Sequence, residues 1–582
     1  MCGIAGIFGG PDPALLERMT RRLHHRGPDG LGTAVVGQAG LGNTRLSLLD
    51  WEGGAQPMKG RTGWTLVYNG ELYNHAALRR NLEREGVTFQ TRSDTEVLLR
   101  ALEQRGLACL EDLEGMFAFA FSDGERLTLV RDAFGIKPLY YALVDGGRRL
   151  LFASELKALL VDTALPRELD RTSLFEWATF RFTLGERTLF KAVRQVPPGG
   201  TLEVSRGPDG TLNLRPGRHS PPRALPLPER EEDRIELLRE RLTDSVRGQW
   251  VADHPVGIFL SGGVDSSLLA ALLAQGGTRE IHTFSLADDP SLPDLAVSRR
   301  LSEALGTQHH EYSFEPDTLL ESLPRSLCSL EGPGEPTIVE TAAPRIRNHV
   351  KAVLCGDGAD ELFAGYVIHS LPGPWLKSCM EGYNRMIRTG EIPQDECAVA
   401  KASLHAMASP DPAAAREAVY RFFLEGQLTD AHLRVWDGGS MASGLEVRVP
   451  YLDRSVRDVA FALPWEQRIR GRVRKALLRE VARRVLPASL ATVIVDRPKL
   501  AAPSAVRRTA EALDRAAREI LPAEEREPHP LQRYCATPAQ RLLLDLFVYL
   551  FVGKGGDLPE GFQWRELYTT HRNELTEALS RI

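Results

Sequence analysis

The stretch that decides the fold is "PVGIFLSGGVDSSLLAALLAQ", residues 255–275. It reads as an apolar strand, a Gly-Gly turn and an apolar run long enough for a helix. The stretches at 281–306 and 350–366 repeat this order of strand, loop and helix. Such alternation predicts an α/β domain with a parallel sheet, which binds its ligands at the carboxyl ends of the strands.

The first 160 residues have a different pattern, in which strand-like runs alternate with amphipathic helical runs. The strand-like runs are residues 3–9, 64–70, 116–131 and 138–154, and the helical runs are residues 13–25, 75–86 and 95–106. Two of the strand-like runs turn at Asp-Gly and Asp-Gly-Gly, as hairpins do. This pattern predicts a layered α+β domain.

A proline-rich stretch separates the two patterns. Eight of the 37 prolines fall between residues 197 and 228, which places a domain boundary there. We therefore expect a first domain at 2–205, a linker at 206–230 and a second domain at 231–582, which becomes mostly helical after residue 370.

The composition excludes several classes of protein. A net charge of -5 over 582 residues gives no field that would attract nucleic acid or an anionic membrane. The longest apolar run, residues 542–552, contains Asp545 and is shorter than the ~20 residues that cross a bilayer, so it indicates a buried helix or strand. The seven cysteines lack the spacing of a zinc site. We therefore expect a reduced, cytoplasmic protein.

Two further features have simple interpretations. The basic stretch at 468–485 lacks interleaved aromatic residues, so we interpret it as a solvated helix and not as a helix that binds nucleic acid. The pairs His24-His25 and His309-His310 have no carboxylate or cysteine partner at ligand spacing. We interpret both pairs as structural and not as metal ligands.

The chain starts with "MCGIAGIFGG", residues 1–10. If Met1 is removed, Cys2 carries both a thiol and a free α-amine, and an α-amine with a pKa of about 7.7 to 8.0 can serve as the base for the thiol. The alternative is that Cys2 is a small buried apolar residue, as many free cysteines are. These ten residues alone leave both interpretations open.

Four motifs follow this cysteine: "HHRGPDG" (24–30), "NTRLSLLD" (43–50), "YNGELYN" (68–74) and "RSDTEV" (92–97). Together with Cys2 they resemble the amino-terminal-nucleophile glutaminase domain of class II glutamine amidotransferases, over roughly the first 200 residues. The resemblance implies an αββα sandwich in which Cys2 attacks the side-chain amide of glutamine.

The resemblance also assigns roles around Cys2. Asn69 and the backbone N–H of Gly70 would form the oxyanion hole. Arg26 would order the loop beside Cys2, the alternative being a surface arginine in a turn.

Glutamine itself carries a carboxylate and an ammonium. By the same resemblance, Arg45 would hold the carboxylate through a bidentate fork, and Glu71 and Asp94 would hold the ammonium. Asn69 completes the set of residues expected to bind glutamine.

The segment "FLSGGVDSS" (259–267) lacks the GxxxxGK[ST] pattern of kinases and GTPases and resembles the SGGxDS loop of ATP pyrophosphatases. An ordinary glycine-rich turn would explain the glycines but not the hydroxyls and the carboxylate. The resemblance implies that backbone amides and the following helix bind the phosphates of ATP. The residues expected to contact ATP are Leu260, Ser261, Gly262, Gly263, Asp265, Ser266, Ser267, Leu286, Cys355 and Gly356. Asp265 would hold Mg²⁺ or order the loop.

Three more motifs in this half are "VLCGDGADELFAGY" (353–366), "SGLEVRVPYLD" (443–453) and "RKALLREV" (474–481). They resemble the synthetase domain of glutamine-hydrolysing asparagine synthetases. The resemblance implies that Lys475 meets the phosphates and that Asp357 is a base or an orienting acid at the acceptor. Asp360, with Asp265, would hold the metal, and Glu361 would complete the polar lining.

The predicted reaction converts ATP, glutamine and a carboxylic acid into AMP, pyrophosphate, glutamate and an amide, with ammonia passing between two sites. The cofactors implied are ATP and Mg²⁺. We expect no nucleic acid or membrane partner, and a homodimer is the candidate assembly. A pyrophosphatase acting on tRNA is opposed by the glutaminase motifs. A catalytically silent relative is opposed because Cys2, Asn69, Asp94, Asp265 and Lys475 are all present.

The acceptor is the least specified part of the prediction. The acidic residue Asp357 favours aspartate, with asparagine as the product. Three departures from the family pattern favour an acid of specialised metabolism: Cys355 stands where serine is usual, Glu340 lies in a shortened segment, and "RPKLAAPSA" (497–505) lacks the usual Gly-Phe. We expect aspartate and keep the second acceptor class as the alternative.

Overall fold

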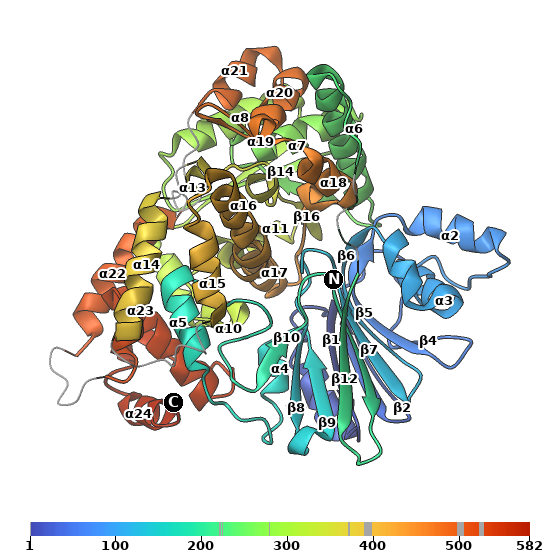
Figure 1. The fold of residues 1–582 in the computed structure, drawn as a ribbon, viewed down its shortest axis with the longest axis vertical. Helices are drawn as coiled ribbons and strands as arrows, with labels where there is room; N and C mark the ends of the chain where they lie inside the picture. Colours follow the sequence, from blue (N-terminus) through green and yellow to red (C-terminus); the bar gives the residue numbers. More distant parts are fainter. Residues whose placement is uncertain are drawn as a thin grey trace.

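The computed structural model describes residues 2–219, 221, 223, 225–278, 280–370, 373–388, 398–497, 506–522 and 529–582 (Figure 1). Its first half contains two six-stranded antiparallel sheets. The first sheet has the strand order β10 (Val193–Gln195), β8 (Tyr140–Val144), β9 (Arg149–Ala153), β1 (Cys2–Phe8), β3 (Ala39–Arg45) and β2 (Gly30–Val36). The second has the order β12 (Leu212–Arg218), β11 (Gly200–Arg206), β7 (Arg126–Arg131), β6 (Gly115–Ser122), β5 (Thr65–Leu72) and β4 (Met58–Lys59). The predicted strand runs are confirmed.

The alternation of side chains along β1 explains why the sheets stack. Ile4 and Phe8 belong to the core between the two sheets, whereas Ala5 and Ile7 pack on the other face with α1 (Pro13–Arg21). On the outer face of the second sheet, α2 (His75–Arg84) and α3 (Asp94–Arg105) cover a third apolar core. The first half therefore has helices outside both sheets, with α1 on the first sheet and α2 and α3 on the second.

Part of the predicted linker is a strand. β12 pairs along its whole length with β11, because Leu212 and Leu214 pack toward the core between the sheets. The prediction of a linker starting at residue 206 was therefore wrong for 212–218. β12 is at the edge of its sheet, so Pro216 can lie in it without removing a hydrogen bond to another strand on the outer side.

The second half contains the predicted parallel sheet. Its strand order is β15 (Gln308–Ser313), β14 (His282–Ala287), β13 (Val256–Phe259), β16 (Ala352–Leu354) and β17 (Glu446–Arg448). From β13 the chain first adds strands on one side and then returns to add β16 on the other. This reversal creates a crevice at the carboxyl ends of β13 and β16, where open α/β sheets bind ligands.

Helices cover and extend this sheet. The helices nearest to β13, β14, β15 and β16 in the sequence are α6 (Glu231–Gln249), α7 (Val264–Gln275), α8 (Pro293–Leu305), α9 (Pro316–Glu321), α10 (Leu323–Leu330), α11 (Ile338–Ile346) and α12 (Ala359–Leu362). The remainder are α13 (Val367–Ser370), α14 (Gly373–Arg388), α15 (Ala398–Met407), α16 (Pro412–Phe422), the π-helix η3 (Phe423–Leu433), α17 (Arg434–Met441), α18 (Arg454–Ala462), α19 (Trp465–Arg468), α20 (Ala476–Val485), α21 (Ala488–Val495), α22 (Arg507–Ile520), α23 (Pro538–Phe547) and α24 (Arg572–Leu579). The first half has two further α-helices, α4 (Leu156–Leu159) and α5 (Arg171–Phe180).

Two sequence predictions concern this helical part. The apolar run at 542–552 is buried, in α23 and the π-helix η7 (Val548–Gly553), and no helix among the described residues is long and apolar enough to cross a membrane. The basic stretch at 468–485 is not one helix. A small hairpin of β18 (Ile469–Arg470) and β19 (Val473–Arg474) precedes α20, because Gly471, with a φ of 60°, forms part of the tight turn between the two strands.

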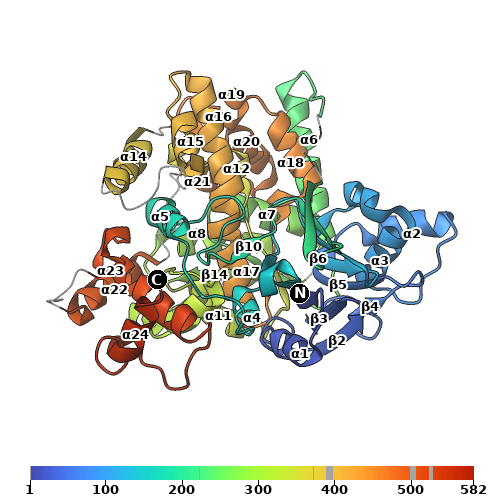
Figure 2. The same ribbon diagram turned by 60° about the horizontal axis from the view of Figure 1, so that its bottom comes forward.

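The two halves meet along β1. Its amino-terminal end lies next to α17 of the second half, as the two views of the chain agree (Figures 1 and 2). The junction therefore brings Cys2 close to the second half.

Candidate active sites

Cys2 is buried at the start of β1, on the face that looks toward the second sheet. Its backbone N–H donates to Oδ1 of Asn69 on β5 over 3.1 Å. Nδ2 of Asn69 is buried and has no hydrogen-bond partner among the described residues. A β-carbon on Gly70 would lie 2.3 Å from the Met116 carbonyl oxygen, so this position requires glycine. An amide donor without a partner thus lies beside the thiol-bearing residue.

Two acidic side chains lie nearby in the fold: Glu71 is on β5, the strand of Asn69, and Asp94 is the first residue of α3. Asp94 accepts hydrogen bonds from the Tyr68 hydroxyl (3.0 Å) and from the N–H of Leu72 (3.1 Å). Glu71 lies with Oε2 3.9 Å from Nη2 of Arg448, while its Oε1 has no partner within the described residues. Burial raises the pKa of both carboxyl groups, and the charge of Asp94 adds to the shift at Glu71. This pair would be stabilised by an additional cation.

Arg45 is directly opposite Cys2 in the pairing of β1 with β3. Its guanidinium donates to the carbonyl oxygens of Asp50 and Trp51, each at 2.6 Å. A β-carbon on Gly54 would lie 2.3 Å from Arg45 Nη2, so this glycine leaves room for the fork. The loop at 49–51 thus fixes the direction of the Arg45 guanidinium, and its role toward the carboxylate of glutamine stays a prediction.

The loop after β13 forms the second candidate site. The N–H of Ser261 donates to Oγ of Ser266 over 3.1 Å, and the two hydroxyls are 3.0 Å apart. Gly262 has a φ of 72°, and a β-carbon there would lie 2.5 Å from the Asp294 carbonyl oxygen. Gly263 precedes α7 without a side-chain cap, and Oγ of Ser267 has no partner among the described residues. The free N–H groups of this helix end suit a phosphate.

Lys475 joins this loop to the loop after β16. Its Nζ lies 2.7 Å from both carboxylate oxygens of Asp265 and 2.7 Å from Oδ1 of Asp360. Burial lowers the pKa of Lys475, but the two carboxylates raise it further, so its net pKa is above the ordinary value. The ammonium is therefore charged in a buried position, as the sequence-based role requires.

The backbone around this lysine is unusual. Lys475 has a φ of 55°, which is rare for a residue with a side chain and occurs most often at functional sites. A β-carbon on Gly365 would lie 1.9 Å from Oδ1 of Asp360 and 2.1 Å from Cε of Lys475. The contact between Lys475 and Asp360 thus depends on a glycine at 365.

The loop after β16 also carries Cys355, Gly356 and Asp357. The Cys355 thiol donates to Oδ2 of Asp357 over 2.7 Å, and burial raises its pKa, which keeps the thiol protonated. A β-carbon on Gly356 would lie 3.2 Å from the N–H nitrogen of Ser266, so this loop lies against the start of α7. His432 on η3 has Nδ1 4.0 Å from Oδ1 of Asp357. No sequence signal pointed to His432, because it is 75 residues away and in no motif.

The remaining predicted residues lie at the same sheet or near it. Leu260 directly follows β13, and its carbonyl oxygen accepts a hydrogen bond from the Ser298 hydroxyl over 3.0 Å, while Leu286 lies on the neighbouring β14. Glu361 is buried and accepts from the Tyr366 hydroxyl. The carboxylate of Glu340 accepts a hydrogen bond from the Ser326 hydroxyl, and burial raises the pKa of Glu340 to about 7. Arg497 pairs with Asp294, and the rest of the motif at 497–505 lies outside the described residues.

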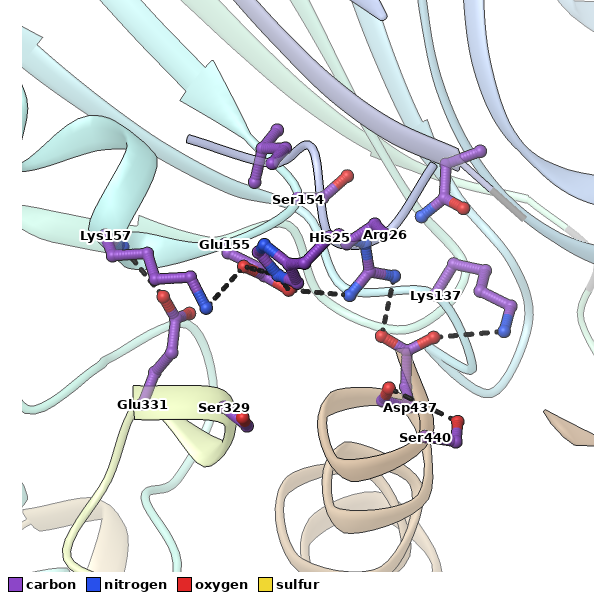
Figure 3. Close-up of polar contacts among 12 residues, drawn as sticks. His25, Arg26, Lys137, Ser154, Glu155, Lys157, Ser329, Glu331, Asp437 and Ser440 are labelled. Atoms are coloured by element: carbon purple, nitrogen blue, oxygen red, sulfur yellow. Dashed lines mark hydrogen bonds and ion pairs between the residues drawn. The ribbon is translucent and has the colours of Figure 1, made fainter. Parts of the chain in front are cut away.

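A chain of buried charges connects the two halves of the molecule at Arg26 (Figure 3). Nε of Arg26 donates to the carbonyl oxygen of Cys2 (3.1 Å), and its two terminal nitrogens donate to Glu155 (2.9 Å) and to Asp437 on α17 (2.8 Å). Asp437 also accepts from Lys137 over 3.1 Å. Arg26 is fully buried, so the alternative of a surface arginine is wrong.

The same chain of charges continues through Glu155 to Lys157, whose Nζ is 2.7 Å away (Figure 3). Glu331 of the second half accepts from the N–H groups of Leu156 and Lys157. A cavity lies beside these charges. Its lining residues come from both halves and include Arg26, Glu155, Glu331, Thr429, Asp430 and Asp437. The η3 helix that supplies Thr429 and Asp430 also carries His432.

Two family models match the chain. One, described as a glutamine amidotransferase domain, covers residues 1–211, and the other, described as asparagine synthase, covers residues 237–545. The chain belongs to the asparagine synthase family. The two models fall on the two halves described above, one on each candidate site.

Two named relatives match this chain over most of its length. Asparagine synthetase [glutamine-hydrolyzing] 1 of Bacillus subtilis (strain 168) is 30% identical, with 87% of each chain covered. Asparagine synthetase B [glutamine-hydrolyzing] of Escherichia coli (strain K12) is 29% identical over 84% of this chain and 80% of its own. Among solved structures, the allosteric regulatory enzyme of purine biosynthesis aligns at 19% identity and a TM-score of 0.31, over 54% of this chain and 80% of its own, too low for a conclusion on the fold.

Proposed function

We propose that this protein forms an amide from a carboxylic acid, with glutamine as the nitrogen donor and ATP as the activating substrate. The observation that carries the proposal is the cluster of Lys475, Asp265 and Asp360, which joins two loops at the switch point of the parallel sheet on a chain that also has the Cys2 site. We propose domain limits of 2–218 and 231–582, an amino-terminal-nucleophile sandwich for the first domain and a phosphate-binding α/β domain for the second.

At the first site, the Cys2 sulfur attacks the side-chain carbonyl carbon of glutamine, and its α-amine accepts the thiol proton. The free Nδ2 of Asn69 and the N–H of Gly70 stabilise the negative charge on the oxygen. The α-amine returns this proton to the amide nitrogen, ammonia leaves, and water then releases glutamate from the thioester. Glu71 and Asp94, whose pKa values are raised by burial, hold the ammonium of the substrate.

At the second site, a carboxylate oxygen of the acceptor attacks the α-phosphorus of ATP and pyrophosphate leaves. Ser261, Ser266, Ser267 and the amino end of α7 bind the phosphates, and Lys475 balances the charge on the leaving group. Ammonia then attacks the acyl carbon and AMP leaves.

The residues also fit Mg²⁺. Asp265 and Asp360 share one ammonium, so the pair keeps a net negative charge and offers the oxygen ligands that this ion prefers. When bound there, Mg²⁺ supplies additional neutralisation of the phosphates.

We propose that ammonia crosses through the cavity beside Arg26. Its lining includes Arg26, which donates to the carbonyl oxygen of Cys2, and residues of η3, the helix that also carries His432, 4.0 Å from Asp357. The buried ion pairs around this cavity exclude solvent from the junction, which keeps ammonia from being lost as ammonium.

A substitution at the junction tests this passage. In Asp437→Asn, Arg26 and Lys137 lose a shared counter-charge although both are buried, so the junction loosens. We expect glutamine hydrolysis to stay within about threefold of the native rate, while the amide formed per glutamate falls by at least about threefold. Product analysis of both compounds measures this ratio. The matched control is Asp557→Asn at an exposed ion pair. An unchanged ratio in Asp437→Asn contradicts the proposed passage.

The acceptor we propose is aspartate. The relatives are named asparagine synthetases, and Asp357 lies at the switch point beside the thiol of Cys355. Pyrophosphate release with glutamine, measured for aspartate, other amino acids and larger apolar acids, tests this choice. We expect saturable release with aspartate. Silence with aspartate and turnover with a larger acid would replace the acceptor and leave the amide-forming mechanism intact, whereas silence with every acid contradicts the proposed function.

A further inference from the structure

Three histidines meet at the side of the parallel sheet, away from the residues assigned to ATP. His282 is the first residue of β14, His310 lies on β15, and His349 precedes β16 by three residues. One ring nitrogen from each lies within 4.8 Å of the others. Among the described residues, this is the one group of three or more histidine, cysteine or acidic side chains with such spacing.

The contacts between the rings are close. Nδ1 of His282 lies 3.0 Å from Nε2 of His310, and the ring centroids of His310 and His349 are 4.1 Å apart. Ligand nitrogens on a tetrahedral zinc ion, at 2.0–2.1 Å from it, are about 3.3 Å from each other. The first pair, at 3.0 Å, is close to this separation, and a ring nitrogen of His349 lies within 4.8 Å of both.

The surroundings hold the rings in place and keep them available. Phe284 stacks against His310 with ring centroids 5.0 Å apart, and His282 and His310 are half-buried. Burial and the neighbouring imidazoles lower the pKa of His310 to about 4, so that its ring is neutral at pH 7. A neutral imidazole has one nitrogen lone pair to donate while the other nitrogen keeps its proton.

We propose that His282, His310 and His349 form a binding site for a divalent transition-metal ion of the zinc type, with water in the fourth position. Three imidazoles favour zinc, nickel or copper over magnesium, which prefers oxygen ligands. The site is separate from the Asp265–Asp360 pair. Because its ligands come from β14, β15 and the segment before β16, a bound ion fastens three parts of the sheet together and stabilises the folded protein.

The prediction that the His309-His310 pair is structural is therefore revised for His310. His309 has its ring near Thr283 and Glu311 and takes no part in the cluster. The partners of His310 are 28 and 39 residues away in the sequence, so no local spacing could indicate the site.

The test is equilibrium dialysis of the full chain, first treated with a chelator, against Zn²⁺ and against Co²⁺ with excess Mg²⁺ present. We expect one ion per chain and a rise in Tm on binding. His310→Gln and His349→Ala should each weaken binding by at least about 100-fold and remove the Tm shift. Two control variants should bind the ion as the native chain does: His309→Ala, next to His310 in the sequence, and Asp265→Asn at the nucleotide site.

The proposal is overturned by an absence of binding at micromolar Zn²⁺ in the native chain, or by native-like binding in both cluster variants. We expect both variants to fold, because neither substitution removes a large apolar side chain. A Tm of the metal-free variants close to that of the metal-free native chain checks this. Loss of binding in Asp265→Asn but not in the cluster variants assigns the ion to the nucleotide site and also contradicts the proposal.

Discussion

The Cys2→Ala variant is expected to lose glutamine-dependent amide formation by at least about 1,000-fold and to keep ammonia-dependent synthesis within about twofold. The loss follows because the thioester forms on the Cys2 sulfur, and a missing nucleophile cannot be replaced by binding alone. Synthesis from ammonium salts continues because the cluster around Lys475 lies in the other half and is untouched. Amide and glutamate formation, with glutamine or ammonium chloride as nitrogen source, measure the two effects.

A matched cysteine variant separates chemistry from packing. Cys109 is also a buried cysteine of the first half, in the apolar core under α3, and has no contact with Asn69. Cys109→Ala should retain glutamine use apart from a modest loss of stability. The nucleophile assignment also requires a free amine on Cys2. If protein that mass spectrometry shows to keep Met1 hydrolyses glutamine at the native rate, the assignment is wrong.

Local pattern was enough to predict most of the fold. The strands β1 and β5 to β9 and the helices α1 to α3 follow from periodicity and from turn residues such as those at 123–124, since these act over a few residues. The linker failed at β12 because its pairing with β11 is a tertiary contact that outweighs the proline signal. The prediction of one helix over 468–485 was also wrong, because the hairpin at Gly471 comes before α20 and leads the chain to Lys475.

The sites divide in the same way. Motif residues such as Asp265 and Lys475 could be named from the sequence because each lies in a recognisable local pattern, although 210 residues separate them. Their common salt bridge, and the place of Gly365 against it, required the folded chain. Asp437 and His432 have no motif at all. They matter because α17 and η3 pack against the first half, which only the tertiary structure shows.

Replacing Lys475 with alanine is the second large effect that we expect. Pyrophosphate release should fall by about 1,000-fold or more, because the developing phosphate charge loses its buried ammonium and because Asp265 and Asp360 then repel each other and the phosphates. Glutamine hydrolysis at Cys2 should stay within about threefold, since the charge removed lies in the other half. Pyrophosphate release with saturating ATP and acceptor, and glutamate release in parallel, give both numbers.

A second substitution tests the same contact without removing the lysine. In Gly365→Ala, the new β-carbon would lie 1.9 Å from Asp360 and 2.1 Å from Lys475, so the two side chains must separate. We expect pyrophosphate release to fall by at least about 30-fold, as for a displaced catalytic group. Lys554→Ala at an exposed ion pair is the matched control and should change neither activity. If Lys475→Ala keeps its native Tm and still releases pyrophosphate at more than a tenth of the native rate, Lys475 is not the counter-charge of the leaving group. If the variant instead releases phosphate and ADP, acceptor activation does not proceed through an acyl adenylate.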